Sequence, residues 1–186
     1  MSDERKQSLF IISYPGRDTA DQVYDALKGL KKEKEIKIKT AAVVYRKDNG
    51  KLKLVHKRRL TTWKGLFGGG AAGLIVAGPA GVLAGVAAGA LVGSSRSGDR
   101  RDVKEFLEDK LGPDDSALAI LITDADWAAV QEAVEPYGGE DLKVELTPEA
   151  EEQIKALAAD PEVAEAAADE VEVEDDAEVE EVDETE

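Results

Sequence analysis

The sequence predicts an α+β protein that is held together by a hydrophobic core, and three observations lead to this prediction. Short apolar runs rich in β-branched residues alternate with amphipathic helical stretches between residues 8 and 146. No cysteine is present, so neither disulfides nor thiolate metal sites hold the chain together. The 186 residues are enough for one domain with a hydrophobic core and further segments.

The first half predicts a strand, a helix and a strand hairpin. The run SLFIISY at 8–14 is the first strand, and Pro15-Gly16 ends it. Asp18 or Thr19 can cap the helix that follows. Its apolar residues recur at helical spacing, at Ala20, Val23, Leu27 and Leu30. Strands over 36–45 and 52–60 are joined by a turn at Asp48-Asn49-Gly50.

The second half alternates helices and strands. Residues 102–111 form an amphipathic helix that Gly112-Pro113 ends. A buried strand over 116–123 and a helix from Asp124 or Asp126 follow. A strand over 142–146 comes next, and a last helix opens at Thr147-Pro148.

The first six elements have the βαββαβ order of a ferredoxin-like sandwich. A large insertion separates its third strand from its second helix, and extra C-terminal αβα elements follow. The expected parts are residues 1–64, the insertion 65–95, residues 96–159 and an acidic, disordered tail over 160–186.

The insertion carries no charged side chain from residue 65 to residue 93 and contains ten glycines. Small residues recur at every fourth position, which places them on one face of a helix and lets a second helix approach closely. These predicted helix-packing residues are Gly65, Gly69, Gly73, Ala77, Gly81, Gly85, Gly89 and Gly93.

In water, ten glycines disfavour a helix by roughly 10 kcal/mol relative to alanine. A bilayer or a tightly packed protein interior can offset this cost. Gly78 and Pro79 form a predicted hinge. Each half is then ~20 Å long, less than the ~30 Å bilayer core. A re-entrant or two-helix membrane hairpin, a hairpin inside a soluble oligomer and a single kinked span all remain open.

Both flanks of the insertion are basic, and the positive-inside tendency keeps basic flanks on the cytoplasmic side. A hairpin satisfies this tendency, whereas a single span exports one flank. The residues expected to contact lipid head groups are Lys57, Arg58, Arg59, Trp63, Lys64, Arg96, Arg100 and Arg101.

The motif Trp63-Lys64-Gly65, the Gly/Ala zipper with its central Gly78-Pro79, and the strand SALAILIT at 116–123 resemble the bacterial and archaeal family known as domain of unknown function 1269. The resemblance covers roughly residues 8–150. It implies a membrane location, and it supplies neither an activity nor catalytic residues.

Charge is divided unevenly along the chain. Residues 149–186 hold 18 acids and one base, whereas residues 28–64 hold 14 bases and three acids. The tail can bind a basic partner or fold back on this basic region, and salt weakens either contact. For the basic region, anionic lipid is the stronger expectation and nucleic acid the weaker one.

No catalytic, cofactor-binding or metal-binding residues are predicted. His56, the only histidine, lies on an alternating strand and reads as a surface residue. Gly68-Gly69-Gly70 lacks the lysine and hydroxyl residue of a phosphate-binding loop. Asp124 and Asp126 fit the start of a helix better than a metal site.

Together these features predict a non-enzymatic protein on the cytoplasmic side of the cell membrane. It binds lipid and forms homo-oligomers through its glycine-zipper hairpin. The alternative is a soluble cytoplasmic scaffold or stress-related protein whose glycine hairpins are buried in an oligomer.

Overall fold

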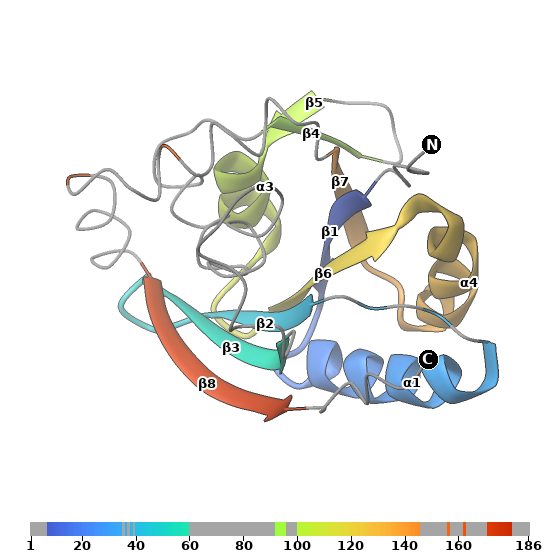
Figure 1. Ribbon diagram of the computed structural model, residues 1–186. Coiled ribbons are helices and arrows are strands. Elements are labelled where there is room, and N and C mark those ends of the chain that lie inside the picture. The colour runs from blue at the N-terminus through green and yellow to red at the C-terminus, as the bar shows by residue number, and fades with distance from the viewer. Residues whose placement is uncertain are drawn as a thin grey trace.

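The computed structural model describes residues 7–34, 36, 38, 40–59, 92–95, 100–145, 156, 162 and 171–179. The α+β class is confirmed (Figure 1). The elements in chain order are β1 (Gln7–Tyr14), α1 (Thr19–Lys34), β2 (Thr40–Arg46), β3 (Leu52–Arg59), β4 (Val92–Ser95), β5 (Arg100–Asp102), α3 (Val103–Lys110), β6 (Ser116–Thr123), α4 (Asp124–Val134), the 3-10 turn η2 (Glu135–Tyr137), β7 (Glu140–Glu145) and β8 (Val171–Val179).

All the strands that the structure describes belong to one sheet, in the order β5-β4-β7-β1-β6-β2-β3-β8. Among the five strands from β7 to β3, each strand is antiparallel to the next one in this order. At one margin β4 and β5 add two short antiparallel strands. At the other margin β8 pairs with β3 in parallel. The sheet therefore joins segments from both ends of the chain.

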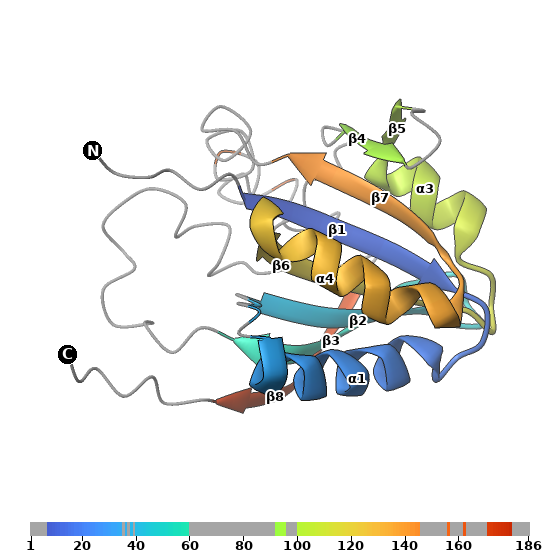
Figure 2. The same cartoon turned by 90° about the vertical axis from the view of Figure 1, so that its right-hand side faces the viewer.

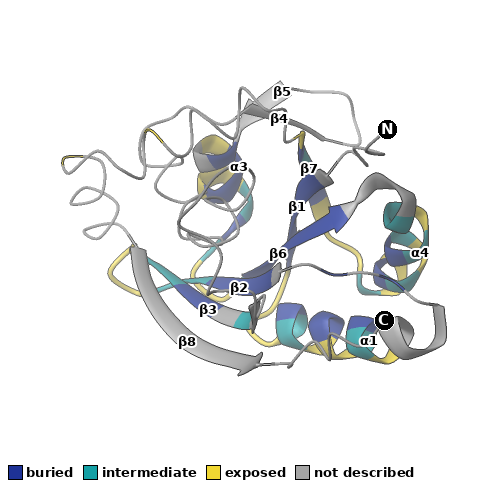
Figure 3. Cartoon of the chain, viewed as in Figure 1, coloured by how far each residue is buried: buried dark blue, intermediate teal, exposed yellow. Residues whose placement is uncertain are grey.

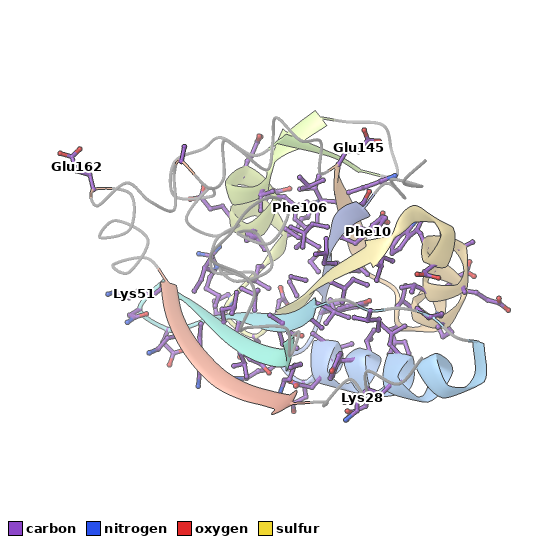
Figure 4. The ribbon with its side chains drawn as sticks, viewed as in Figure 1. Phe10, Lys28, Lys51, Phe106, Glu145 and Glu162 are labelled. Carbon is purple, nitrogen blue, oxygen red and sulfur yellow. The ribbon has the colours of Figure 1, made fainter. Side chains whose placement is uncertain are left out.

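The sheet is covered by helices on both faces (Figure 2). Leu9 and Ile11 of β1 pack with Phe106 of α3, whereas Phe10 and Ile12 pack on the side of α1 and α4. Figure 3 shows the buried residues along β1, β6 and the inner sides of these helices, and Figure 4 shows Phe10 and Phe106 in the two cores.

The position of α3 differs from the arrangement expected from the sequence. A sandwich built from the first six elements places the 102–111 helix beside α1, but α3 lies on the opposite face. The physical reason lies in the strands. Successive residues of a strand point to opposite faces of the sheet, and in β1 and β6 the residues on both faces are buried. A sheet that is apolar on both faces needs cover on both faces.

Two boundaries also differ from those expected. The helix α1 continues to Lys34, and β2 begins at Thr40 rather than at residue 36. Ile36 and Ile38 precede the strand and are buried in the core shared by α1 and α4. The alternation of apolar and polar residues at 36–39 therefore reflects two buried side chains before the strand, and not the strand itself.

The acidic tail is not wholly disordered, because residues 171–179 form β8. Its sequence starts with Val-Glu-Val-Glu, a period of two that suits a strand. In the parallel register, Val171 and Val173 stand beside Leu52 and Leu54 of β3. The prediction of disorder over 160–186 is therefore wrong for this stretch.

The N-terminus of α1 is capped from a distant strand. The buried Ser116 hydroxyl at the start of β6 donates to the Gly16 carbonyl (2.7 Å) and accepts from the Ala20 amide (3.1 Å). Thr19, one of the two expected caps, instead donates its hydroxyl to the Pro15 carbonyl (2.7 Å). This arrangement joins the β1–α1 turn to β6.

A close approach between the η2–β7 connection and β1 requires glycine at position 139. Gly139 has φ +100°, and a Cβ there would lie 2.5 Å from the Ser13 carbonyl oxygen. Gly138 also has a positive φ (+69°), but nothing lies within 4 Å of its Cβ position. We therefore expect Gly139→Ala, which adds a clash to a positive φ, to destabilise the protein more than Gly138→Ala, which carries only the ~1–3 kcal/mol cost of a backbone conformation that is essentially restricted to glycine (φ +69°, ψ −152°).

Urea unfolding of both variants measures the difference. Gly29→Ala is the control, because Gly29 is exposed on α1 with nothing within 4 Å, and alanine there favours the helix by up to ~1 kcal/mol. Equal destabilisation by the changes at 138 and 139 would contradict the close approach to β1.

Candidate functional site

The first predicted basic flank lies on β3, next to the margin of the sheet. This strand, LKLVHKRR, contains four basic residues and no acid. It is hydrogen-bonded to β2 on one side and to the tail strand β8 on the other. The surface expected to meet lipid head groups is thus part of the sheet.

Lys57 occupies a bulge in this strand. In the pairing with β2, Ala41 stands beside Arg58 and Ala42 beside His56, so Lys57 is passed over. A bulge re-aims the side chain of the extra residue. The Lys57 ammonium lies 2.8 Å from the Asp21 carboxylate of α1, and only 17% of the lysine side chain is exposed.

Two tyrosines complete a polar cluster around this ion pair. Tyr24 donates its hydroxyl to the Lys57 carbonyl oxygen (3.1 Å), and Tyr45 of β2 donates its hydroxyl to Asp21. Burial, and then the hydrogen bond to Asp21 and its negative charge, raise the pKa of Tyr45. Tyr45 therefore stays protonated and acts as a donor to the carboxylate.

The cluster of Asp21, Tyr24, Tyr45 and Lys57 joins α1 to β2 and β3. It places the Lys57 charge against the protein's own helix, and the contact of Lys57 with lipid head groups stays a prediction. Sequence reasoning missed the cluster because a bulge leaves no local signal. Only the spacing of Asp21 and Tyr24, three residues apart on one helix face, was visible beforehand.

The remaining basic residues of β3 stand beside the acidic strand. In the register of β3 and β8, Lys53 is opposite Glu172, His56 is opposite Asp175 and Arg58 is opposite Glu178. Arg59 stands opposite Val179. The backbone of β8 therefore brings the most acidic stretch of the sequence to the most basic strand.

The second basic flank lies at the other margin. Arg100 and Arg101 belong to β5, and Arg101 stands opposite Gly93 of β4. The prediction that Gly93 continues a helical ladder is wrong, because Val92–Ser95 is an extended strand paired with β5 and β7. The ladder can therefore be helical only before residue 92.

Strand directions relate the two flanks. Five antiparallel pairings lead from β3 across the sheet to β4, so these two strands run in opposite directions. The end of β3 at Arg59 and the start of β4 at Val92 consequently point toward the same end of the sheet. The chain leaves and rejoins the sheet on one side.

The other predicted site residues lie outside the described residues. They are Gly65, Gly69, Gly73, Ala77, Gly81, Gly85, Gly89, the hinge Gly78 and Pro79, and Trp63, Lys64 and Arg96. Among the helices that the structure does describe, none has both the length and the apolar character needed to cross a bilayer.

The other candidate ligands and catalytic side chains that the structure describes do not gather into a metal site or an active site. Within the described ranges, no three His, Asp or Glu side chains lie close enough together to hold a metal ion. Asp124 is the first residue of α4. A small pocket between β1, the end of α4 and the η2–β7 connection is lined by Ile12, Trp127, Val134 and Asp141, among others.

The ion pair between Asp21 and Lys57 predicts a measurable coupling. Asp21→Asn keeps an acceptor for Tyr45 but removes the negative charge that lies 2.8 Å from the largely buried ammonium of Lys57. We expect a loss of about 1–2 kcal/mol in the free energy of unfolding. Lys57→Met should largely suppress this loss in the double variant, because neighbouring residues couple in a mutant cycle.

Asp25→Asn is the matched control, because it makes the same charge change at an exposed position of the same helix. Equal effects of the changes at 21 and 25, with additive behaviour of the double variant, would show that the ion pair does not stabilise the fold.

The chain was compared with known families, curated proteins and solved structures. No curated protein and no solved structure matches it. The family model described as "Protein of unknown function (DUF1269)" matches residues 62–159. This range holds the apolar insertion and the elements from β4 to β7, whereas β1 to β3 precede it. Because the match covers more than half of the sequence, the chain belongs to the DUF1269 family.

Proposed function

We propose that this protein is a non-enzymatic, membrane-associated protein. Its apolar insertion enters the cytoplasmic face of a bilayer as a glycine-zipper hairpin, through which the protein forms homo-oligomers. The uncharged sequence from Gly65 to Leu91, with its small residues at every fourth position, supports this proposal.

The observation that carries the proposal is the direction of β3 and β4. Because the chain leaves β3 and rejoins β4 toward the same end of the sheet, both basic flanks belong on one side of a bilayer. A re-entrant segment or a two-helix hairpin satisfies this requirement. A single span would have to return by a second crossing, and the sequence offers no second apolar segment of that length.

We further propose that the folded frame is ferredoxin-like, built from β1-α1-β2 and β6-α4-β7. The strand order β7-β1-β6-β2, with every neighbour antiparallel, supports this assignment. So does the common core of α1 and α4 on one face of the sheet. In this frame the insertion, together with β3 and α3, lies between the second and third strands.

A soluble oligomer remains the competing function, because a hairpin buried at a symmetry axis also needs both of its ends on one side. Alanine and glycine transfer into a bilayer less favourably than leucine does, which favours this second possibility. A bilayer and an oligomer core differ in whether lipid is required, and this difference can be measured.

Flotation with liposomes tests the membrane proposal. The full chain should float with phosphatidylcholine–phosphatidylserine vesicles and remain bound at high salt, because insertion depends on apolar burial rather than on screened charges. Leu74→Asp combined with Leu83→Asp should abolish salt-resistant flotation, since each acid in a membrane helix costs about 2.5–3.5 kcal/mol.

The matched control is Leu74→Ala with Leu83→Ala, which shortens the same side chains without adding charge. Circular dichroism checks that all variants retain the fold. A full chain that stays at the bottom of the gradient as a large particle would contradict the membrane proposal and favour the soluble scaffold.

A further inference from the structure

The pairing of β3 with β8 brings a basic strand beside an acidic one and places opposite charges at two register positions. The nine residues of β8 contain five acids and no base, and β3 contains four bases and no acid. Lys53 faces Glu172, and Arg58 faces Glu178, across the parallel ladder. Figure 1 shows β8 following β3 along the margin of the sheet.

Charge contributes to this pairing at two register positions, Lys53 with Glu172 and Arg58 with Glu178. A strand with five acids in nine residues repels itself and is a poor strand former by composition. Opposite charges at facing positions contribute roughly 0.2–1 kcal/mol each. Apolar support is limited in the register to Val171 and Val173, which stand beside Leu52 and Leu54. A competing anionic surface therefore removes the contribution of the two charge pairs and leaves β8 to its backbone hydrogen bonds and these two valines.

The direction of β8 adds a second constraint. Because β8 runs parallel to β3, it ends at Val179 beside Arg59, where β3 ends. The sequence then continues with five acids among its last seven residues. The strand β8 thus ends at the end of the sheet from which the apolar insertion departs.

We infer that β8 is an intramolecular latch: it pairs with the basic strand β3 and competes there with the anionic head groups of a lipid bilayer. This inference rests on the proposed function, since it adds a regulatory contact to the same membrane-facing end. With β8 in place, the tail repels an anionic bilayer. Once β8 is displaced, the charges of Lys53 and Arg58 become available to the head groups.

A disulfide lock tests the latch directly, because the native chain contains no cysteine. Lys53→Cys with Glu172→Cys places the only two thiols at facing positions of β3 and β8, within the Cα separations that disulfides span. The oxidised protein holds β8 on β3, whereas in the reduced protein an anionic bilayer can displace it. The two states have the same sequence, so the loss of one charge from each strand cancels in the comparison.

The measurement is flotation at low salt with vesicles of phosphatidylcholine alone and with vesicles containing phosphatidylserine. The reduced protein should bind the anionic vesicles at least about fivefold more tightly than the oxidised protein, the gain expected when one more Lys or Arg reaches such a surface. Binding to neutral vesicles should not change. Glu172→Gln with Glu174→Gln and Glu178→Gln, made in the native chain, should raise anionic binding as reduction does.

Each other outcome overturns the latch. Equal anionic binding in the two redox states would remove the competition but leave the membrane proposal standing. If the protein binds neither kind of vesicle in either redox state, both the latch and the membrane proposal are contradicted. Failure of the disulfide to form within one chain, or its formation only between two chains, would show that β8 does not cover the β3 of its own molecule.

Discussion

The hydrogen-bonded continuity of the sheet is the constraint on which the other features depend. Strands between residues 7 and 179 pair in one sheet, so the direction of each strand is fixed relative to its neighbours. The apolar insertion cannot therefore leave and return at arbitrary places. Its two ends are attached to β3 and β4, whose opposite directions bring the chain back toward the end from which it left.

The same sheet explains the distribution of charge and apolar surface. The central strands β1 and β6 are covered on both faces, by α1 and α4 on one side and by α3 on the other. The described basic residues that flank the insertion are on strands near the margins, β3 and β5. A margin strand exposes backbone groups unless another segment pairs with it, and for β3 that segment is β8.

Much of the fold could be predicted from the sequence because its signals are local. Continuous apolar runs located β1 and β6, a period of two located β3, and helical spacing located α3 and α4. The Asn49-Gly50 turn placed the β2–β3 hairpin. The side of the sheet on which α3 packs could not be predicted, since it depends on how the neighbouring strands are ordered. The alternation of Ile36 and Ile38 was misleading because two buried residues in a connection imitate a strand.

The candidate site shows the same division. Composition alone revealed the basic region and the acidic tail, and their possible association followed from charge. The bulge at Lys57, and with it the contact to Asp21, requires knowledge of the register between β2 and β3. Gly93 was assigned to a helix because its spacing fits the ladder, whereas pairing with Arg101 places it in a strand.

Site-specific labelling tests the central claim that both flanks of the insertion lie on one side of the membrane. Thr62→Cys and Ser97→Cys, each the only cysteine of its variant, can be labelled with an impermeant maleimide in vesicles of known orientation. Labelling of both positions from the cytoplasmic side alone is the predicted result. Labelling of the two positions from opposite sides would contradict the claim, because one continuous sheet could not then connect β3 with β4.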